Sequence, residues 1–298
     1  MTIEKLLERQ NPDGGWPYLR GGSWTEPTVY AILALLAAGE QERADRGMRW
    51  IAELVRPDGG WAPRPGVEES VWVTGLVALL PPERLGQARF DGAIQWLLRT
   101  RGEETTLHTR VREFLLGNAR PPDEKYPGWP WLPGTAAWVG PTSIAILALR
   151  RTERLEKFSG REGRSSVLGS RLESGRRFLL ARACQEGGWN HGSARALGYE
   201  SRPYPETTGM ALAALAGVRS PEVDRALTAA RQFLFECRSA DAHNWLRLGL
   251  MAHGQMPADY CAPALNYRTT IETALDSLVG QKDNPFLEAA WGQPGGRA

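Results

Sequence analysis

The stretch Gln10-Asn-Pro-Asp-Gly-Gly-Trp16 decides the fold, because related stretches return further along the chain. The other copies are Arg56-Pro-Asp-Gly-Gly-Trp61 and Gln185-Glu-Gly-Gly-Trp189. Each copy follows an amphipathic stretch and precedes a polar loop and then a second, apolar stretch. Asp and Gly supply the backbone freedom that ends one helix and turns the chain. The repeat therefore predicts a helical hairpin that is used several times.

The apolar stretches after these turns also resemble one another. They are rich in Ala and Leu and cover residues 26–36, 71–80, 141–149 and 206–215. Ala and Leu favour helix, and the windows lack the period-two alternation of a strand. When they are aligned on this core, Thr28 is matched by Trp72, Thr142 and Thr208. The first helix of each hairpin should face solvent, and the second, apolar nearly all round, should be buried.

A ring of such hairpins satisfies both kinds of helix, so we predict an all-α protein, an α/α toroid (α6-α6 barrel). The expected helices cover 2–10, 26–38, 41–55, 68–80, 87–100, 104–117, 140–151, 170–184, 205–217, 221–236, 241–253 and 266–280. We predict one domain over 1–298. An irregular Pro/Trp-rich loop over 119–140 and a basic connection over 150–170 should interrupt it.

The charge of the chain argues against a nucleic-acid binder, because 36 Lys and Arg against 34 Asp and Glu give a net charge of only +2. The basic residues gather between Arg150 and Arg177, which favours a solvated connection or, alternatively, a patch for an anionic membrane surface. Three Cys fit a reducing compartment. The amino terminus lacks an apolar signal core, and the longest apolar run is shorter than the roughly 20 residues that span a bilayer. We expect a soluble, cytoplasmic protein.

The Gly-Gly-Trp segments resemble the QW motif of the squalene-cyclase and protein-prenyltransferase superfamily. The second copy matches best, and a decayed copy precedes the long loop. The matching residues are Arg46, Gly47, Trp50, Ile51, Gly59 and Trp61, then Gly175, Phe178, Leu179, Gly187 and Trp189, with Ala93, Trp96 and Leu97 in the decayed copy. The resemblance weakens after about residue 218. It implies a toroid with a central cavity, in which the motif itself is structural.

The resemblance also implies where a catalytic acid would lie. In class II terpene cyclases the acid stands two residues before a Thr at the start of an inner helix. Glu206, before Thr208, and Glu26, before Thr28, occupy this position. Both are Glu where the family has Asp, and no Asp-x-Asp-Asp motif exists in the chain. The alternative is that the two carboxylates only stabilise the start of their helices.

Aromatic side chains are the second requirement of a cyclase, because ring faces stabilise a carbocation. Trp16, Trp61 and Trp189 are expected in the core. The candidates for substrate binding are Trp24, Trp72, Trp129, Trp131, Trp138, Tyr204, Trp245 and Tyr267, and Tyr30 is a further aromatic candidate.

The sequence contains no motif that clearly indicates a metal or cofactor site. Prenyltransferases hold zinc with Asp, Cys and His, but the spacing of Cys237, Asp241 and His243 does not match theirs. A glycine-rich phosphate loop is absent from the sequence. We predict no metal and no cofactor, and leave open whether these three residues converge.

The sequence therefore predicts a terpenoid cyclase-like protein that acts on or binds an apolar isoprenoid, with Glu206 as the general acid. Two alternatives stay open: a toroid that binds an apolar ligand without chemistry, and a subunit that resembles a prenyltransferase β subunit. A peripheral membrane contact and a homodimer are also left open.

Overall fold

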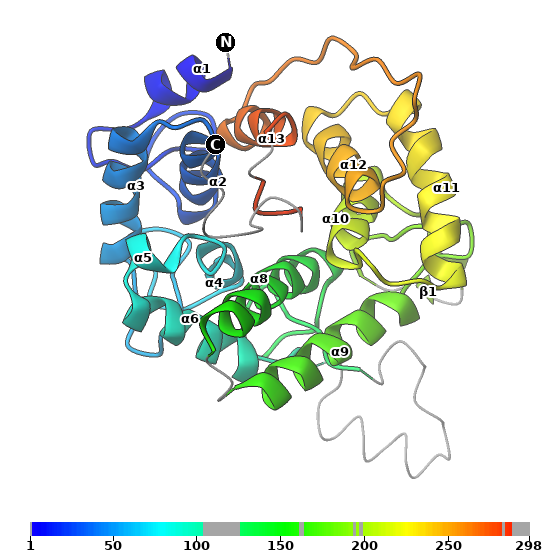
Figure 1. Cartoon of the computed structure of the whole chain (residues 1–298), viewed down its shortest axis with the longest axis horizontal. Helices are drawn as coiled ribbons and strands as arrows, with labels where there is room; N and C mark the ends of the chain where they lie inside the picture. The colour runs from blue at the N-terminus through cyan, green and yellow to red at the C-terminus, as the bar shows by residue number, and fades with distance from the viewer. Residues whose placement is uncertain are drawn as a thin grey trace.

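The computed structural model describes residues 2–103, 126–160, 164–192, 195–196, 199–281 and 284–287. In this part of the chain, the apolar stretches form an inner ring of helices that runs once around a central axis (Figure 1). Neighbours in the ring contact one another, and the last helix contacts the first, which closes the ring. The inner helices are α2 (Thr25–Ala37), α4 (Val73–Val77), α8 (Val139–Ser159), α10 (Pro205–Ala214), α12 (Ala240–Ala252) and α13 (Thr270–Val279).

An outer layer covers this ring. It consists of α1 (Thr2–Arg9), α3 (Gln41–Glu53), α5 (Pro82–Leu85), α6 (Gln87–Arg99), α9 (Ser165–Ala181) and α11 (Pro221–Glu236). Two short strands, β1 (Arg195–Ala196) and β2 (Tyr199–Glu200), pair antiparallel before α10. The predicted fold class, an all-α toroid, is confirmed, whereas the helix expected over 104–117 lies outside the described residues. None of the helices in the described residues is both long and apolar enough to cross a bilayer.

One hydrogen-bond pattern joins the two layers in each Gly-Gly-Trp hairpin. The indole Nε1 of Trp16, Trp61 and Trp189 donates to a carbonyl of the preceding outer helix, over 2.6–2.8 Å. The backbone N–H of the same three residues donates to a Thr hydroxyl on the following inner helix. The accepting Thr residues are Thr28, Thr74 and Thr208. Thr74, and not Trp72, is therefore the match to Thr28, so the predicted alignment was two residues out.

Trp129 repeats this pattern and so belongs to the core. Its Nε1 donates to the Leu97 carbonyl (2.9 Å), and its backbone N–H donates to the Thr142 hydroxyl (2.9 Å). The prediction that Trp129 binds substrate is wrong, because the ring fills the place of Trp16 in the third hairpin and does not line the central cavity. An insertion hides the relation in the sequence: 32 residues separate Leu97 from Trp129, against 10 between Leu6 and Trp16.

The Asp-Gly-Gly turns tie each hairpin to the next. Asp13 accepts from the Gly15 N–H and, across the interface, from Trp50 Nε1 of α3. Gly14 has φ +98° and lies so close to the Arg46 carbonyl that a Cβ would come within 2.8 Å of its oxygen. This position therefore requires Gly, both for its backbone angle and for the close approach.

The basic segment 150–170 is mostly helical, which corrects the prediction of a solvated connection. Arg150 and Arg151 are buried on α8. Arg150 donates to the carbonyls of Ala213 and Ala214 at the end of α10, and Arg151 donates to carbonyls at the end of α4. Carbonyls at the ends of helices carry negative partial charge, which favours a cation beside them. Arg150 and Arg151 therefore stabilise the inner ring.

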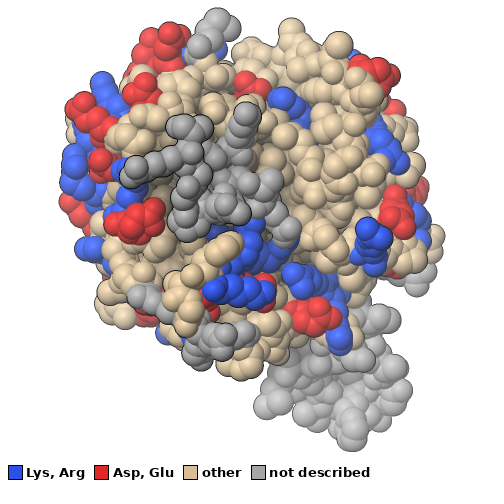
Figure 2. All heavy atoms as spheres, viewed as in Figure 1, with Lys and Arg blue, Asp and Glu red and all other residues tan. Residues whose placement is uncertain are grey.

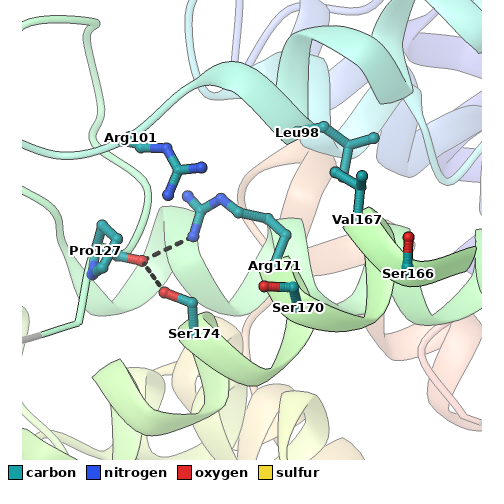
Figure 3. Close-up of a pocket in the computed structure, with 8 residues that line it drawn as sticks. All are labelled: Leu98, Arg101, Pro127, Ser166, Val167, Ser170, Arg171 and Ser174. Atoms are coloured by element: carbon teal, nitrogen blue, oxygen red, sulfur yellow. Dashed lines mark hydrogen bonds between the residues drawn. The ribbon is translucent and has the colours of Figure 1, made fainter. Parts of the chain in front are cut away.

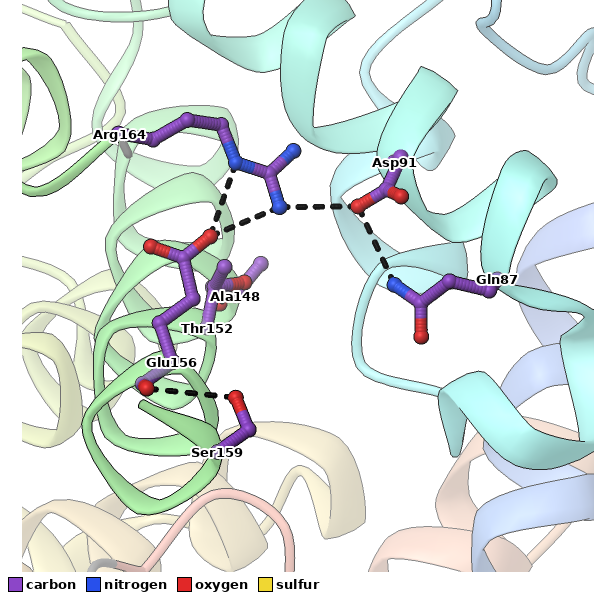
Figure 4. A network of polar contacts seen from close by, with 7 residues as sticks. All are labelled: Gln87, Asp91, Ala148, Thr152, Glu156, Ser159 and Arg164. Atoms are coloured by element: carbon purple, nitrogen blue, oxygen red, sulfur yellow. Dashed lines mark hydrogen bonds and ion pairs between the residues drawn. The ribbon is translucent and has the colours of Figure 1, made fainter. Parts of the chain in front are cut away.

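Further along, Arg164 fixes the start of α9 between two other helices (Figure 4). Its guanidinium lies 2.8 Å from the Asp91 carboxylate of α6 and 2.7 Å from the Glu156 carboxylate of α8. Elsewhere on the face shown in Figure 2, acidic and basic side chains are interspersed around the rim of the ring.

Candidate functional site

A cavity of about 260 Å³ lies at the amino ends of the inner helices. The second residue of five of these helices lines it, and Trp72, directly before α4, supplies the sixth position. Each of these six lining residues lies two residues before a Thr or, in α12, a His of the same helix. The pairs are Glu26 and Thr28, Trp72 and Thr74, Gly140 and Thr142, Glu206 and Thr208, Asp241 and His243, and Ile271 and Thr273. The toroid thus presents one equivalent residue per inner helix to a shared space.

A second tier lies one helical turn deeper. Tyr30, Met210 and Trp245 follow the three acidic positions by four residues, which places them on the same faces of α2, α10 and α12. Trp131 comes in from the 126–138 loop and meets Trp72 edge to face, with ring centroids 4.7 Å apart. The cavity is therefore lined by three carboxyl groups at the helix starts, with the aromatic rings of Trp72 and Trp131 beside them and those of Tyr30 and Trp245 further in.

Glu26 is the cavity carboxyl group whose pKa shift is best defined. Burial raises its pKa to about 7, and the charge of Glu206 adds to this. The hydrogen bond that Tyr18 Oη donates to Glu26 Oε2 acts in the opposite direction. Near neutral pH the site therefore holds Glu26 in both protonation states.

The other two acids are perturbed in the same direction. Burial raises the pKa of Glu206, while His191, which also lines the cavity, opposes the rise. Burial, followed by the charges of Glu206 and Glu26, raises the pKa of Asp241 well above its ordinary value. Asp241 Oδ1 is buried without a hydrogen-bond partner. Since three like charges cannot be held together in a cavity of this size at low cost, the site retains protons at neutral pH.

Five of the residues that the sequence offered as site candidates line this cavity, and the others lie elsewhere. The five that line it are Glu26, Glu206, Trp72, Trp131 and Trp245. The remaining candidates are not among its lining residues. Trp24 packs against Tyr18 and Arg64, Tyr204 against His191, Tyr267 donates to Asp276, and Trp138 is 38% exposed.

Other lining residues were missed or misassigned. Tyr30 was one of the aromatic candidates, but the sequence did not single out Tyr18 as the partner of Glu26, and it assigned Asp241 only to a metal cluster. His243 instead contacts the Tyr260 hydroxyl through Nε2 (3.1 Å), and among the described residues no three His, Cys, Asp or Glu side chains converge as metal ligands. The signal for Asp241 was its place two residues before His243, the position that Glu206 holds before Thr208.

A second hollow, between α6 and α9, is occupied by structural contacts (Figure 3). Arg171 points into it, but its guanidinium donates to the carbonyls of Thr100, Pro127 and Gly128 and stacks 3.4 Å from the Trp129 ring. This hollow therefore supports the loop that carries Trp129, and the central cavity is the better candidate for function.

The sequence and the fold of the chain are similar to those of several known proteins. A stretch of 44 residues, 14% of this chain, is 46% identical to the squalene–hopene cyclase of Alicyclobacillus acidocaldarius and covers 7% of that enzyme. The type II terpene cyclase MstE from Scytonema, solved as a variant with geranylgeranyl dihydroxybenzoate, aligns over 94% of this chain and 75% of its own, with a TM-score of 0.52 and 18% identity. The chain is thus similar to a squalene–hopene cyclase over a short stretch of its sequence, and its fold is similar to that of a type II terpene cyclase.

The same fold also carries other chemistry. The endo-β-1,4-glucanase CMCax from Acetobacter xylinum aligns over 93% of this chain and 96% of its own, with a TM-score of 0.57 and 13% identity. The family 8 glycosyl hydrolase Cel10 from Klebsiella pneumoniae aligns with a TM-score of 0.54 and 15% identity, over 93% and 97% of the two chains. No family model matches the chain. At these identities the likeness concerns the fold, so function must be argued from the cavity.

Proposed function

We propose that the chain binds a short apolar isoprenoid in the central cavity and that Glu206 protonates it. The observation that carries this proposal is one cavity that brings together carboxyl groups whose pKa is raised by burial and the aromatic rings of Trp72, Trp131, Tyr30 and Trp245. A volume of about 260 Å³ lies just below the roughly 300–1,000 Å³ of ligand pockets, which favours a short chain. MstE, bound to a geranylgeranyl compound, supports the ligand class by analogy.

Among the three acids, Glu206 is the best proton donor. Protonation of an alkene requires a carboxyl group that is both protonated and acidic. Asp241 has its pKa raised most strongly by burial and neighbouring charges, which makes it a poor acid. Glu26 is engaged by Tyr18. Glu206 alone of the three has His191 acting to restore its acidity.

The rings and the remaining carboxyls would serve the later steps. A proton from Glu206 forms a new C–H bond and leaves a positive carbon in the chain. The faces of Trp72, Trp131 and Trp245 would each stabilise that charge by about 0.5–2 kcal/mol. Loss of a proton from a neighbouring carbon to a carboxylate at the rim then gives a neutral, rearranged product.

The test is product formation. We expect incubation with geranyl, farnesyl and geranylgeranyl diphosphates and with squalene to yield a cyclised or isomerised product, detected by mass spectrometry. Glu206→Gln should lower turnover about a hundredfold or more, the usual contribution of a general acid, without lowering the melting temperature. Unaltered turnover in this variant would remove Glu206 from the role. Saturable binding without product in the unmodified protein would favour the non-catalytic toroid.

Glycoside hydrolysis is a second candidate, because it also uses a pair of carboxyl groups, one protonated and one ionised. The specific observation in its favour is that Glu26, Glu206 and Asp241 share one cavity and that burial raises the pKa of each by a different amount. The depth of the cavity, lined by Tyr30, Met210 and Trp245, argues for an apolar occupant instead. Release of reducing sugar from cello-oligosaccharides would reverse this preference.

A further inference from the structure

The chain after α13 turns back into the centre of the ring. Asn284 makes this turn: its Nδ2 donates to the Leu278 carbonyl (2.8 Å), and its Oδ1 accepts from the Phe286 N–H (3.0 Å). Asn284 is fully buried, so the turn belongs to the interior. Figure 1 shows the 284–287 segment, in red, inside the ring of helices.

The turn places the Phe286 ring against two side chains that line the cavity. Phe286 is 2% exposed, with its ring centroid 6.0 Å from that of Tyr30 and 5.1 Å from that of Trp245. Tyr30 and Trp245 also contact each other edge to face. They come from α2 and α12, which flank α13 in the ring. Phe286 therefore joins the two sides of the ring behind the aromatic tier.

We propose that Phe286 closes the inner end of the cavity and thereby limits the length of the ligand. The acids Glu26 and Asp241 lie at the amino ends of α2 and α12, and Tyr30 and Trp245 lie one turn deeper. Phe286 packs against both of these rings, so a chain that enters past the acids would end at this aromatic cluster. The choice of ligand class rests on the proposed function, whereas the closure itself rests on the contacts of Phe286.

The first arm of the test measures ligand length. Binding of geraniol, farnesol and geranylgeraniol to the full chain is followed by calorimetry. Phe286→Ala should shift the preference towards the next longer alcohol by about tenfold, because the vacated space buries part of one more isoprene unit. Phe286→Leu, which keeps most of the packing, should give a smaller shift in the same direction. Phe90→Ala, in the buried face of α6, removes an equal ring far from Tyr30 and Trp245 and should leave the preference unchanged.

The second arm separates the closure from the ligand class. Benzene enters dry apolar cavities left by truncated side chains, so it should raise the melting temperature of the Phe286→Ala protein more than that of the unmodified protein. Benzene binding without binding of any alcohol would keep the closure and defeat the isoprenoid proposal. Alcohol binding with the same length preference in all variants, and no added benzene effect, would overturn the closure and leave the proposed function standing. If the Ala variant does not fold, the Leu variant decides by the same two measurements.

Discussion

The two ends of the inner helices differ in the charged groups that lie against them. At the carboxyl ends of α4 and α10, Arg151 and Arg150 donate to terminal carbonyls. At the amino ends, Glu26, Glu206 and Asp241 face one cavity, and burial raises the pKa of each. The first end is built for stability, with charge set against opposite partial charge. At the second end, buried carboxyl groups lie close to one another where a ligand would bind. Such an unfavourable arrangement of charge is typical of functional sites.

Removing a charge at the carboxyl end should have the largest effect on stability. Arg151→Met keeps much of the aliphatic stem but leaves the Leu79 and Leu80 carbonyls buried without a donor. Hydrogen bonds to charged groups contribute about 1.5–3 kcal/mol each, so we expect a loss of about 3–5 kcal/mol. Urea unfolding measures it.

The matched control lies on the same helix. Lys157→Met removes an exposed cation that pairs with Glu153 at 3.5 Å, and should cost less than about 0.5 kcal/mol. Equal losses for the two variants would contradict a special role of the Arg151 contacts.

At the amino end the same kind of change should stabilise the protein, and the gain should depend on pH. The folded pKa of Glu26 is about 7, against an ordinary value of 4.5. Below pH 4.5 both folded and unfolded chains hold the proton, and the residue has no effect. As the pH rises to 7, only the unfolded chain loses it, so stability falls by roughly 3 kcal/mol and then levels off.

Glu26→Gln should abolish this dependence. Its stability advantage over the unmodified protein should grow between pH 5 and pH 7, as followed by chemical denaturation at each pH. Glu42→Gln, on the exposed face of the outer helix α3, should behave like the unmodified protein. An advantage that is constant with pH would show that Glu26 is not kept protonated by the fold.

The contrast between the ends also marks the limit of prediction from sequence. The Gly-Gly-Trp repeats predicted the ring, because a repeated local pattern is visible without tertiary contacts. Glu26 and Glu206 were found through the Thr two residues later. Asp241 was not, because His243 replaces that Thr and no Gly-Gly-Trp precedes α12. The burial of Arg150 and Arg151 could not be predicted from the sequence. Their hydrogen-bond acceptors are backbone carbonyls of other helices, which the pattern of charged residues does not reveal.

The smallest expected effect tests whether the acids share one electrostatic site. The charge of Glu206 contributes to the raised pKa of Glu26, although less than burial does. Glu206→Gln should therefore lower the pKa of Glu26 by less than about one unit, measured from the pH dependence of its carboxyl carbon in nuclear magnetic resonance spectra. Glu222→Gln, on the outer helix α11, changes the net charge equally and should leave that titration in place. If the two variants shift Glu26 alike, the carboxyl groups respond to overall charge rather than to one another, and the cavity loses the coupling that would keep protons available for transfer.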